Sequence, residues 1–143
     1  ISDPARPREV GHAPAAYEAL DVIVADGLAY VAAIDGVHVL DIVDFQHPIE
    51  LGHYDTLGPD GRLGAVIQKM QLVDNHLYLA FDHGSISVLD VSRPREPTLV
   101  GHIAPGFGPE GGPVEFHGLA VAGEHVFIAS NPGGLMVLRS TPE

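Results

Sequence analysis

One twelve-residue segment occurs three times in this chain, and it constrains the fold more than any other feature. The copies occupy residues 1–12, 42–53 and 91–102, and each ends in an apolar residue followed by Gly-His. The glycines of successive copies lie 41 and 49 residues apart, close to the period of four-stranded propeller blades. The chain is therefore predicted to repeat one supersecondary unit.

A second repeated block accompanies these segments, at residues 22–32, 70–80 and 119–129. Each copy predicts two short β-strands around a tight turn, because Asp-Gly, Asp-Asn and Gly-Glu stand at the centres and such residues tolerate positive φ. A third apolar run follows each block and ends in Val-Leu-Asp, Val-Leu-Asp and Val-Leu-Arg. With the Gly-His segment as the fourth strand, each unit is predicted to be one blade.

Composition supports an all-β fold. Hydrophobic residues make up 45% of the 143 residues, enough for a core between stacked sheets. Apolar residues alternate, helical spacing is absent, and Gly (17) and Pro (12) recur at turns. We expect about three four-stranded blades, with residues 1–12 as an outer strand completing another blade, 13–53 as blade 1, 54–102 as blade 2, and 103–143 as blade 3 without its outer strand.

Charge and residue usage exclude several classes of function. The formal net charge is −12, so nucleic acid is a poor partner, since phosphate recognition needs a basic surface. The chain has no Cys, which excludes disulfides and thiolate catalysis. It also lacks a signal peptide and any apolar run of about 18 residues, so no membrane insertion is expected.

The repeated residues resemble those of the LVIVD-repeat family of β-propellers. The closest matches are Ala29-Tyr30-Val31-Ala32, Val39-Leu40-Asp41-Ile42 and the segment from Ile1-Ser2-Asp3-Pro4 to Val10-Gly11. This resemblance covers nearly the whole chain and implies a propeller fold. It also implies a secreted, periplasmic or cell-surface protein, because members are often of that kind, but it implies little about biochemistry.

The number of blades predicts an assembly. Propellers typically contain 4 to 8 blades, and three twisted sheets cannot meet around an axis. A lone copy would expose an apolar sheet face and an unpaired strand edge. We therefore expect either a head-to-tail homodimer forming a six-bladed ring, or further blades elsewhere in a longer propeller.

The innermost strands of all blades converge on the central channel, so their polar residues are the candidates for a site. The predicted channel-lining residues are Glu18, Asp21, Gln68, Lys69, Glu115 and His117. In a two-fold ring, His117 and Glu115 would occur twice and could hold a divalent metal through nitrogen and oxygen ligands. The competing interpretation is that these groups only hydrate the channel.

The remaining histidines are interpreted as structural. His12, His53 and His102 share one position in the repeat, and outer strands of different blades diverge, so these three cannot converge on one ion. His38 alternates with apolar residues and is expected on an exposed strand face. Two long Gly-rich loops, Thr56–Gly64 and Gly106–Pro113, precede innermost strands and are interpreted as a recognition surface or as linkers.

Two classes of function remain. The first is a non-enzymatic scaffold or binding module for a protein, peptide or glycan. The second is a metal-dependent hydrolase or oxidoreductase with its site in the channel, which is suggested only by analogy with other propeller enzymes. No motif for phosphate binding, nucleophilic catalysis or calcium binding is present. We therefore predict a binding module without a cofactor and keep a divalent metal as the alternative.

Overall fold

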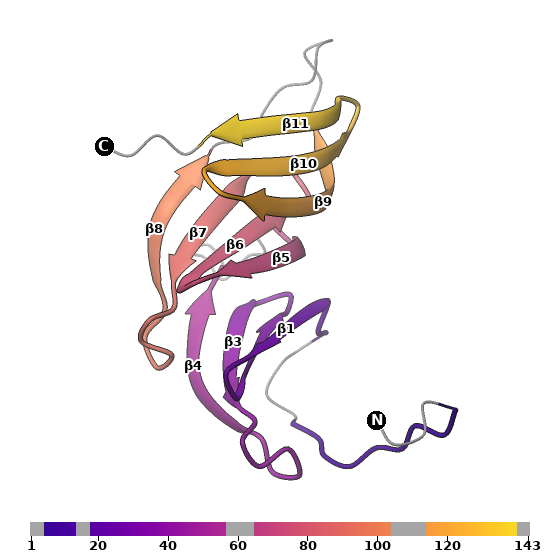
Figure 1. The fold of residues 1–143 in the computed structure, drawn as a ribbon, viewed down its shortest axis with the longest axis vertical. Helices are drawn as coiled ribbons and strands as arrows, with labels where there is room; N and C mark the ends of the chain where they lie inside the picture. Colours follow the sequence, from indigo (N-terminus) through magenta and orange to yellow (C-terminus); the bar gives the residue numbers. More distant parts are fainter. Residues whose placement is uncertain (1–4, 14–17, 57–64, 104–113, 140–143) are drawn as a thin grey trace.

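The computed structural model describes residues 5–13, 18–56, 65–103 and 114–139. Within these ranges the chain forms three antiparallel sheets, of four, four and three strands. The sheets follow one another along the longest axis of the molecule (Figure 1). The prediction of an all-β chain built from propeller blades is confirmed.

Each sheet is a meander in which every strand pairs with its neighbour along the chain. The first sheet, blade 1, contains β1 (Asp21–Ala25), β2 (Leu28–Ala32), β3 (Gly36–Asp41) and β4 (Ile49–Asp55). The second sheet, blade 2, contains β5 (Ile67–Val73), β6 (His76–Phe81), β7 (Ile86–Asp90) and β8 (Thr98–Ile103). The third sheet, blade 3, contains β9 (Glu115–Ala122), β10 (His125–Asn131) and β11 (Gly134–Arg139).

The predicted hairpin turns join the first two strands of each blade. Asp26 and Gly27 both have positive φ, 50° and 75°, as a type I′ turn requires at its two central residues. Asp74 has φ 52° and Gly123 has φ 58° in the equivalent turns. The short polar residues at these positions therefore set the turns that fix the register of each blade.

A β-bulge recurs in the outer strand of blades 1 and 2. Val39 pairs with Gly52 but Leu40 pairs with Glu50, so Leu51 is the extra residue. In blade 2 the same shift leaves Val100 unpaired between Leu99 and Gly101. Because an extra residue reverses the alternation of side chains, the bulge moves Glu50 to the opposite face from Gly52.

Two apolar cores lie between the blades. The face of blade 1 that carries Tyr30 packs against the first face of blade 2. The opposite face of blade 2, which carries Ala80 and Ile86, packs against blade 3. Among the described residues, the side chains buried most completely in these cores are Ile67, Leu77, Leu79, Ile86, Leu89, Ile128, Val37, Val39 and Val114.

Polar side chains join the innermost strands of neighbouring blades. The Asp21 carboxylate on β1 accepts a hydrogen bond from the Met70 amide of β5 at 3.0 Å. Gln71 on β5 accepts from the Val121 amide of β9 at 2.7 Å and donates to the Val121 carbonyl at 3.4 Å. These bonds fix the position of each innermost strand along the innermost strand of the next blade.

Of the first repeated segment, the structure describes residues 5–12, and these residues form no strand. Its assignment to another blade stays a prediction, and so do the blade boundaries. Most of the two Gly-rich loops lies outside the described residues.

Candidate functional site

Three of the predicted channel residues surround one pocket. Gln68 on β5 and Glu115 and His117 on β9 line a cavity of about 420 Å³, together with Asp82 and His83. The two strands that carry them, β5 and β9, are in contact. The pocket is therefore rich in carboxylate and imidazole groups.

The other predicted channel residues lie apart from this pocket. Asp21 is mostly buried and joins two blades, with one carboxylate oxygen 3.9 Å from Lys69 Nζ. Glu18 lies exposed before β1 with φ 46°. The structure thus brings Asp21 and Lys69 together, and separately Gln68, Glu115 and His117.

The predicted metal ligands Glu115 and His117 are close but exposed. Their carboxylate oxygen and Nε2 lie 3.9 Å apart, with 67% and 58% of the side chains exposed. Across residues 5–13, 18–56, 65–103 and 114–139, the group of three or more ligand-type side chains that could share an ion lies elsewhere, in blade 1. A metal at His117 stays a prediction.

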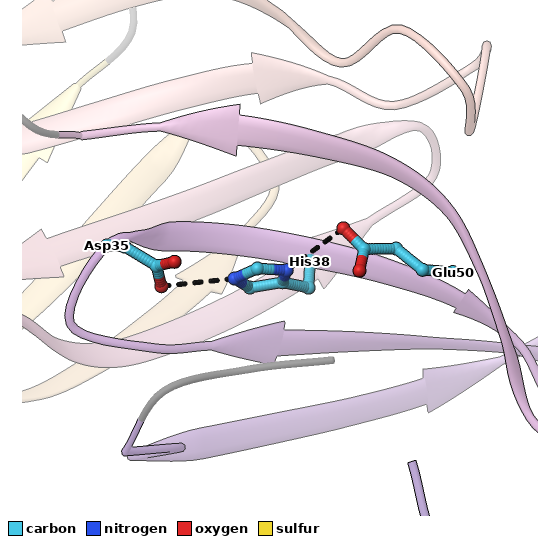
Figure 2. Close-up of polar contacts among 3 residues, drawn as sticks. All are labelled: Asp35, His38 and Glu50. Carbon is cyan, nitrogen blue, oxygen red and sulfur yellow. Dashed lines mark hydrogen bonds and ion pairs between the residues drawn. The ribbon is translucent and has the colours of Figure 1, made fainter. Parts of the chain in front are cut away.

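A second polar site, which sequence reasoning missed, surrounds His38 on β3 (Figure 2). His38 Nε2 lies 3.1 Å from an Asp35 carboxylate oxygen, and His38 Nδ1 lies 3.1 Å from a Glu50 carboxylate oxygen. The His38 side chain is only 5% exposed, whereas those of Asp35 and Glu50 are 26% and 35% exposed. A buried imidazole is thus held between two carboxylates.

His53 completes this site from the neighbouring strand. It is the cross-strand partner of His38, and the two rings stack with centroids 4.3 Å apart and planes 10° from parallel. One ligand-type atom each of Asp35, His38 and His53 lies within 4.8 Å of the other two. Asp35, His38, Glu50 and His53 are called the His38 cluster below.

Local backbone features of blade 1 assemble the cluster. Gly36 starts β3 at φ 150°, and a side chain there would collide with the Tyr54 carbonyl and approach His53 Nε2 to 3.1 Å. The bulge at Leu51 places Glu50 on the same face as His53. Residue types and backbone geometry therefore both contribute to the site.

The electrostatics of Asp35 follow from its neighbours. Burial alone would raise the pKa of the Asp35 carboxyl, but the hydrogen bond with His38, a backbone hydrogen bond of its own, and the charges of His38 and His53 lower the pKa overall. The cluster thus favours the ionised carboxylate, which is the form that accepts hydrogen bonds or binds a cation.

One expectation from the sequence is corrected here. His38 was expected on an exposed strand face, but it is buried because Asp35, Glu50 and the ring of His53 surround it. The histidines at the end of each repeat are interpreted as structural, and in the structure His53 stacks on His38 while His102 bonds to Ser87. The sequence signal that could have revealed the cluster is the three-residue spacing of Asp35 and His38, combined with the expected pairing of the strands that carry His38 and His53.

The cluster is specific to blade 1. In blade 2 the position of His38 is taken by Ser87, whose hydroxyl lies 3.2 Å from His102 Nδ1, and Leu99 stands in the place of Glu50. In blade 3, Met136 takes the His38 position and packs at the apolar core. The fold of the repeat therefore does not require the cluster.

Comparison with family models finds the LVIVD repeat at residues 17–56 and 67–104, more than half of the chain. The chain belongs to the LVIVD repeat family. The two matched repeats correspond to blades 1 and 2. A search of curated proteins finds no match to this LVIVD chain. In the described ranges, no helix has the length and apolar character needed to span a membrane.

Proposed function

We propose that this LVIVD chain is half of a six-bladed ring, closed head to tail by a second copy, and that the ring serves as a non-enzymatic binding module. One observation carries the proposal. The outer faces of blades 1 and 3 carry exposed apolar residues, and the equivalent residues of the repeat pack against each other between blades 1 and 2.

The exposed face of blade 3 is the first of these. Its Leu135 and Val137 are 68% and 51% exposed. The repeat aligns them with Val37 and Val39 of blade 1, which are fully buried against blade 2. This face of blade 3, called the forward face, therefore carries the same residue types that pack against the next blade in blade 1.

The back face of blade 1 is its complement; at its centre Ala29, Val31 and Leu40 are buried with Ala13 packed against them, and its inner strand is exposed. Val22 and Val24 are 57% and 63% exposed. Their repeat equivalents in blade 2 are Met70 and Leu72, which belong to the core with blade 1. This back face of blade 1 and the forward face of blade 3 match the two sides of the interface that the chain already forms twice.

The segment around Gly11 supports the same arrangement. Gly52 lies against the backbone of Pro94 and Arg95, in the loop before the outer strand of the next blade. Gly11 lies in the same way against the backbone of Phe45 and Gln46, the equivalent loop of blade 1. The Gly11 segment thus lies where the outer strand of a preceding blade would run, beside the back face.

A second copy is the occupant that fits both faces. Head-to-tail contact of identical units closes when the rotation per unit allows it, and two copies give six blades, within the usual range for propellers. Burying both faces also removes exposed apolar surface. In this position the Gly11 segment could pair with the edge strand β11 of the second copy.

The pocket between β5 and β9 is the proposed recognition site of the module. It is lined by the carboxylates of Asp82 and Glu115, the imidazoles of His83 and His117, and the Gln68 amide. With a net charge of −12 on the chain, the chemistry that fits best is a basic side chain of a peptide or protein. A neutral glycan is the weaker alternative.

The experiment is a molar mass measurement by light scattering on the full chain and on Leu135→Asp. We expect about twice 15.1 kDa for the unmodified chain and a monomer for Leu135→Asp, because a buried unpaired carboxylate opposes docking. Val43→Lys is the matched control, since Val43 is 79% exposed and belongs to neither face. A monomeric unmodified chain, or an unchanged mass for Leu135→Asp, would refute the proposal.

A further inference from the structure

We propose that the His38 cluster is a binding site for a divalent first-row transition metal such as zinc, with Asp35, His38 and His53 as ligands. The site lies in blade 1, distinct from the pocket lined by Glu115 and His117. His38 and His53 stand in one cross-strand row with Val22, on the back face that the proposed second copy would adjoin, but all the ligands come from one chain.

The donor atoms have the chemistry and spacing that such an ion needs. Two imidazoles and one carboxylate supply borderline nitrogen and hard oxygen ligands, a set common for zinc. Ligand atoms around a tetrahedral zinc ion lie about 3.3 Å apart, since the bonds are 2.0 to 2.1 Å long. His38 Nε2 lies 3.1 Å from Asp35, and the three donors lie within 4.8 Å of one another.

Glu50 provides the support that a histidine ligand requires. A metal-bound histidine usually donates its other ring N–H to a carboxylate, which fixes the tautomer and the ring orientation. The Glu50 oxygen lies 3.1 Å from His38 Nδ1 on the side of the ring away from Asp35. His38 is thus oriented with Nε2 toward Asp35 (Figure 2).

His38 has a carboxylate oxygen at each of its ring nitrogens. A neutral imidazole has one N–H and can donate to only one of the two carboxylates. With Nδ1 donating to Glu50, the Nε2 lone pair and the Asp35 carboxylate oxygen are both available to one cation. The His53 ring stacks on His38 with planes 10° from parallel, so it would turn about its side-chain bonds to direct its own lone pair at the same ion.

In the single chain the site is open to an ion from solvent. His53 is exposed and Asp35 is partly exposed, while His38 is buried. Three protein ligands leave a position for water on a four-coordinate ion. The repeat does not demand the cluster, since blade 2 holds Ser87 and Leu99 in the positions of His38 and Glu50.

The test is zinc titration of the full chain after removal of bound metal by a chelator, followed by calorimetry. We expect one tight equivalent, and cobalt(II) in its place should give the visible absorption of a tetrahedral site. His53→Ala should abolish this binding, and Glu50→Gln should weaken it by about 10- to 100-fold. Magnesium should not compete, because it prefers oxygen ligands and octahedral geometry.

The matched control is His102→Ala, which removes the equivalent histidine of blade 2. Equal loss of zinc binding in His102→Ala and His53→Ala would refute the site, as would no tight equivalent in the unmodified chain. Circular dichroism of metal-free His53→Ala should match the unmodified chain, because His53 is exposed.

Leu135→Asp separates this proposal from the proposed function. The variant should lose the second copy and still bind one zinc per chain, because all ligands come from blade 1. If it is monomeric and fails to bind zinc while the dimeric chain binds it, the ligand set proposed here is wrong and the assembly stands.

Discussion

Single residues decide how closely the blades approach. At Gly52, a side chain would meet the Pro94 carbonyl, with the Arg95 Cα at 2.9 Å from its Cβ. These are backbone atoms, which cannot rotate away as a flexible side chain could. The glycine before each histidine of the repeat is therefore explained in blade 1 by packing against the next blade and not by an unusual φ.

We predict that Gly52→Ala lowers the free energy of unfolding by about 1–3 kcal/mol, the usual cost of overpacking a tight contact. Gly101→Ala is the matched control, because its Cβ would meet only Val88 at 3.6 Å, and it should change stability by less than about 0.5 kcal/mol. Urea denaturation of both variants measures the difference. Equal effects would show that the glycines matter for another reason.

Residue identity also explains why the His38 cluster was not predicted. The sequence indicates that His38 lies on a strand with alternating apolar residues, and it indicates that His53 repeats in every blade. Neither pattern shows that β3 and β4 pair with these two residues opposite each other. Contact between strands depends on register, which the turn and bulge set and which a single sequence specifies only weakly.

At the scale of strands, the innermost elements are held by polar bonds as well as by the apolar cores. Gln71 uses both ends of its amide on the backbone of Val121. Such a pair of bonds fixes β9 along β5 and satisfies backbone groups that no neighbouring strand of the same sheet reaches.

We predict that Gln71→Ala destabilises the packing of blade 3 on blade 2 by about 1–3 kcal/mol, because it leaves partly buried backbone groups without a partner. Gln68→Ala is the control on the same strand, since Gln68 is exposed. Hydrogen exchange at the Val121 amide should rise in the first variant alone. Unchanged protection there would contradict the role assigned to Gln71.

The strands themselves were the most predictable level. Alternation, turn residues and the repeat are sufficient to predict the three meanders, because each signal is local; the further outer strand predicted at residues 1–12 is absent from its described residues 5–12. The bulges at Leu51 and Val100 were not predicted, since the extra residue carries no distinctive chemistry. For Glu50 this changes the face on which the side chain lies, and with it the His38 cluster.

At the scale of the whole molecule, the described residues form a stack of three blades whose two outer faces carry exposed apolar side chains. The repeat is sufficient to predict that the channel residues lie on or beside the innermost strands. It does not predict which groups of the neighbouring blade they contact. Asp21 was expected to line a channel, and it also bonds to Met70 between the blades.

The arrangement of the ends leads to one direct test, which uses the absence of cysteine from the chain. Val24→Cys marks the back face and Val137→Cys marks the forward face, and both side chains are exposed within one chain. A short thiol-to-thiol cross-linker should convert the double variant into a covalent dimer of about twice 15.1 kDa, and neither single variant should cross-link. Single variants that cross-link as well as the double variant, or a double variant that stays monomeric, would contradict head-to-tail closure.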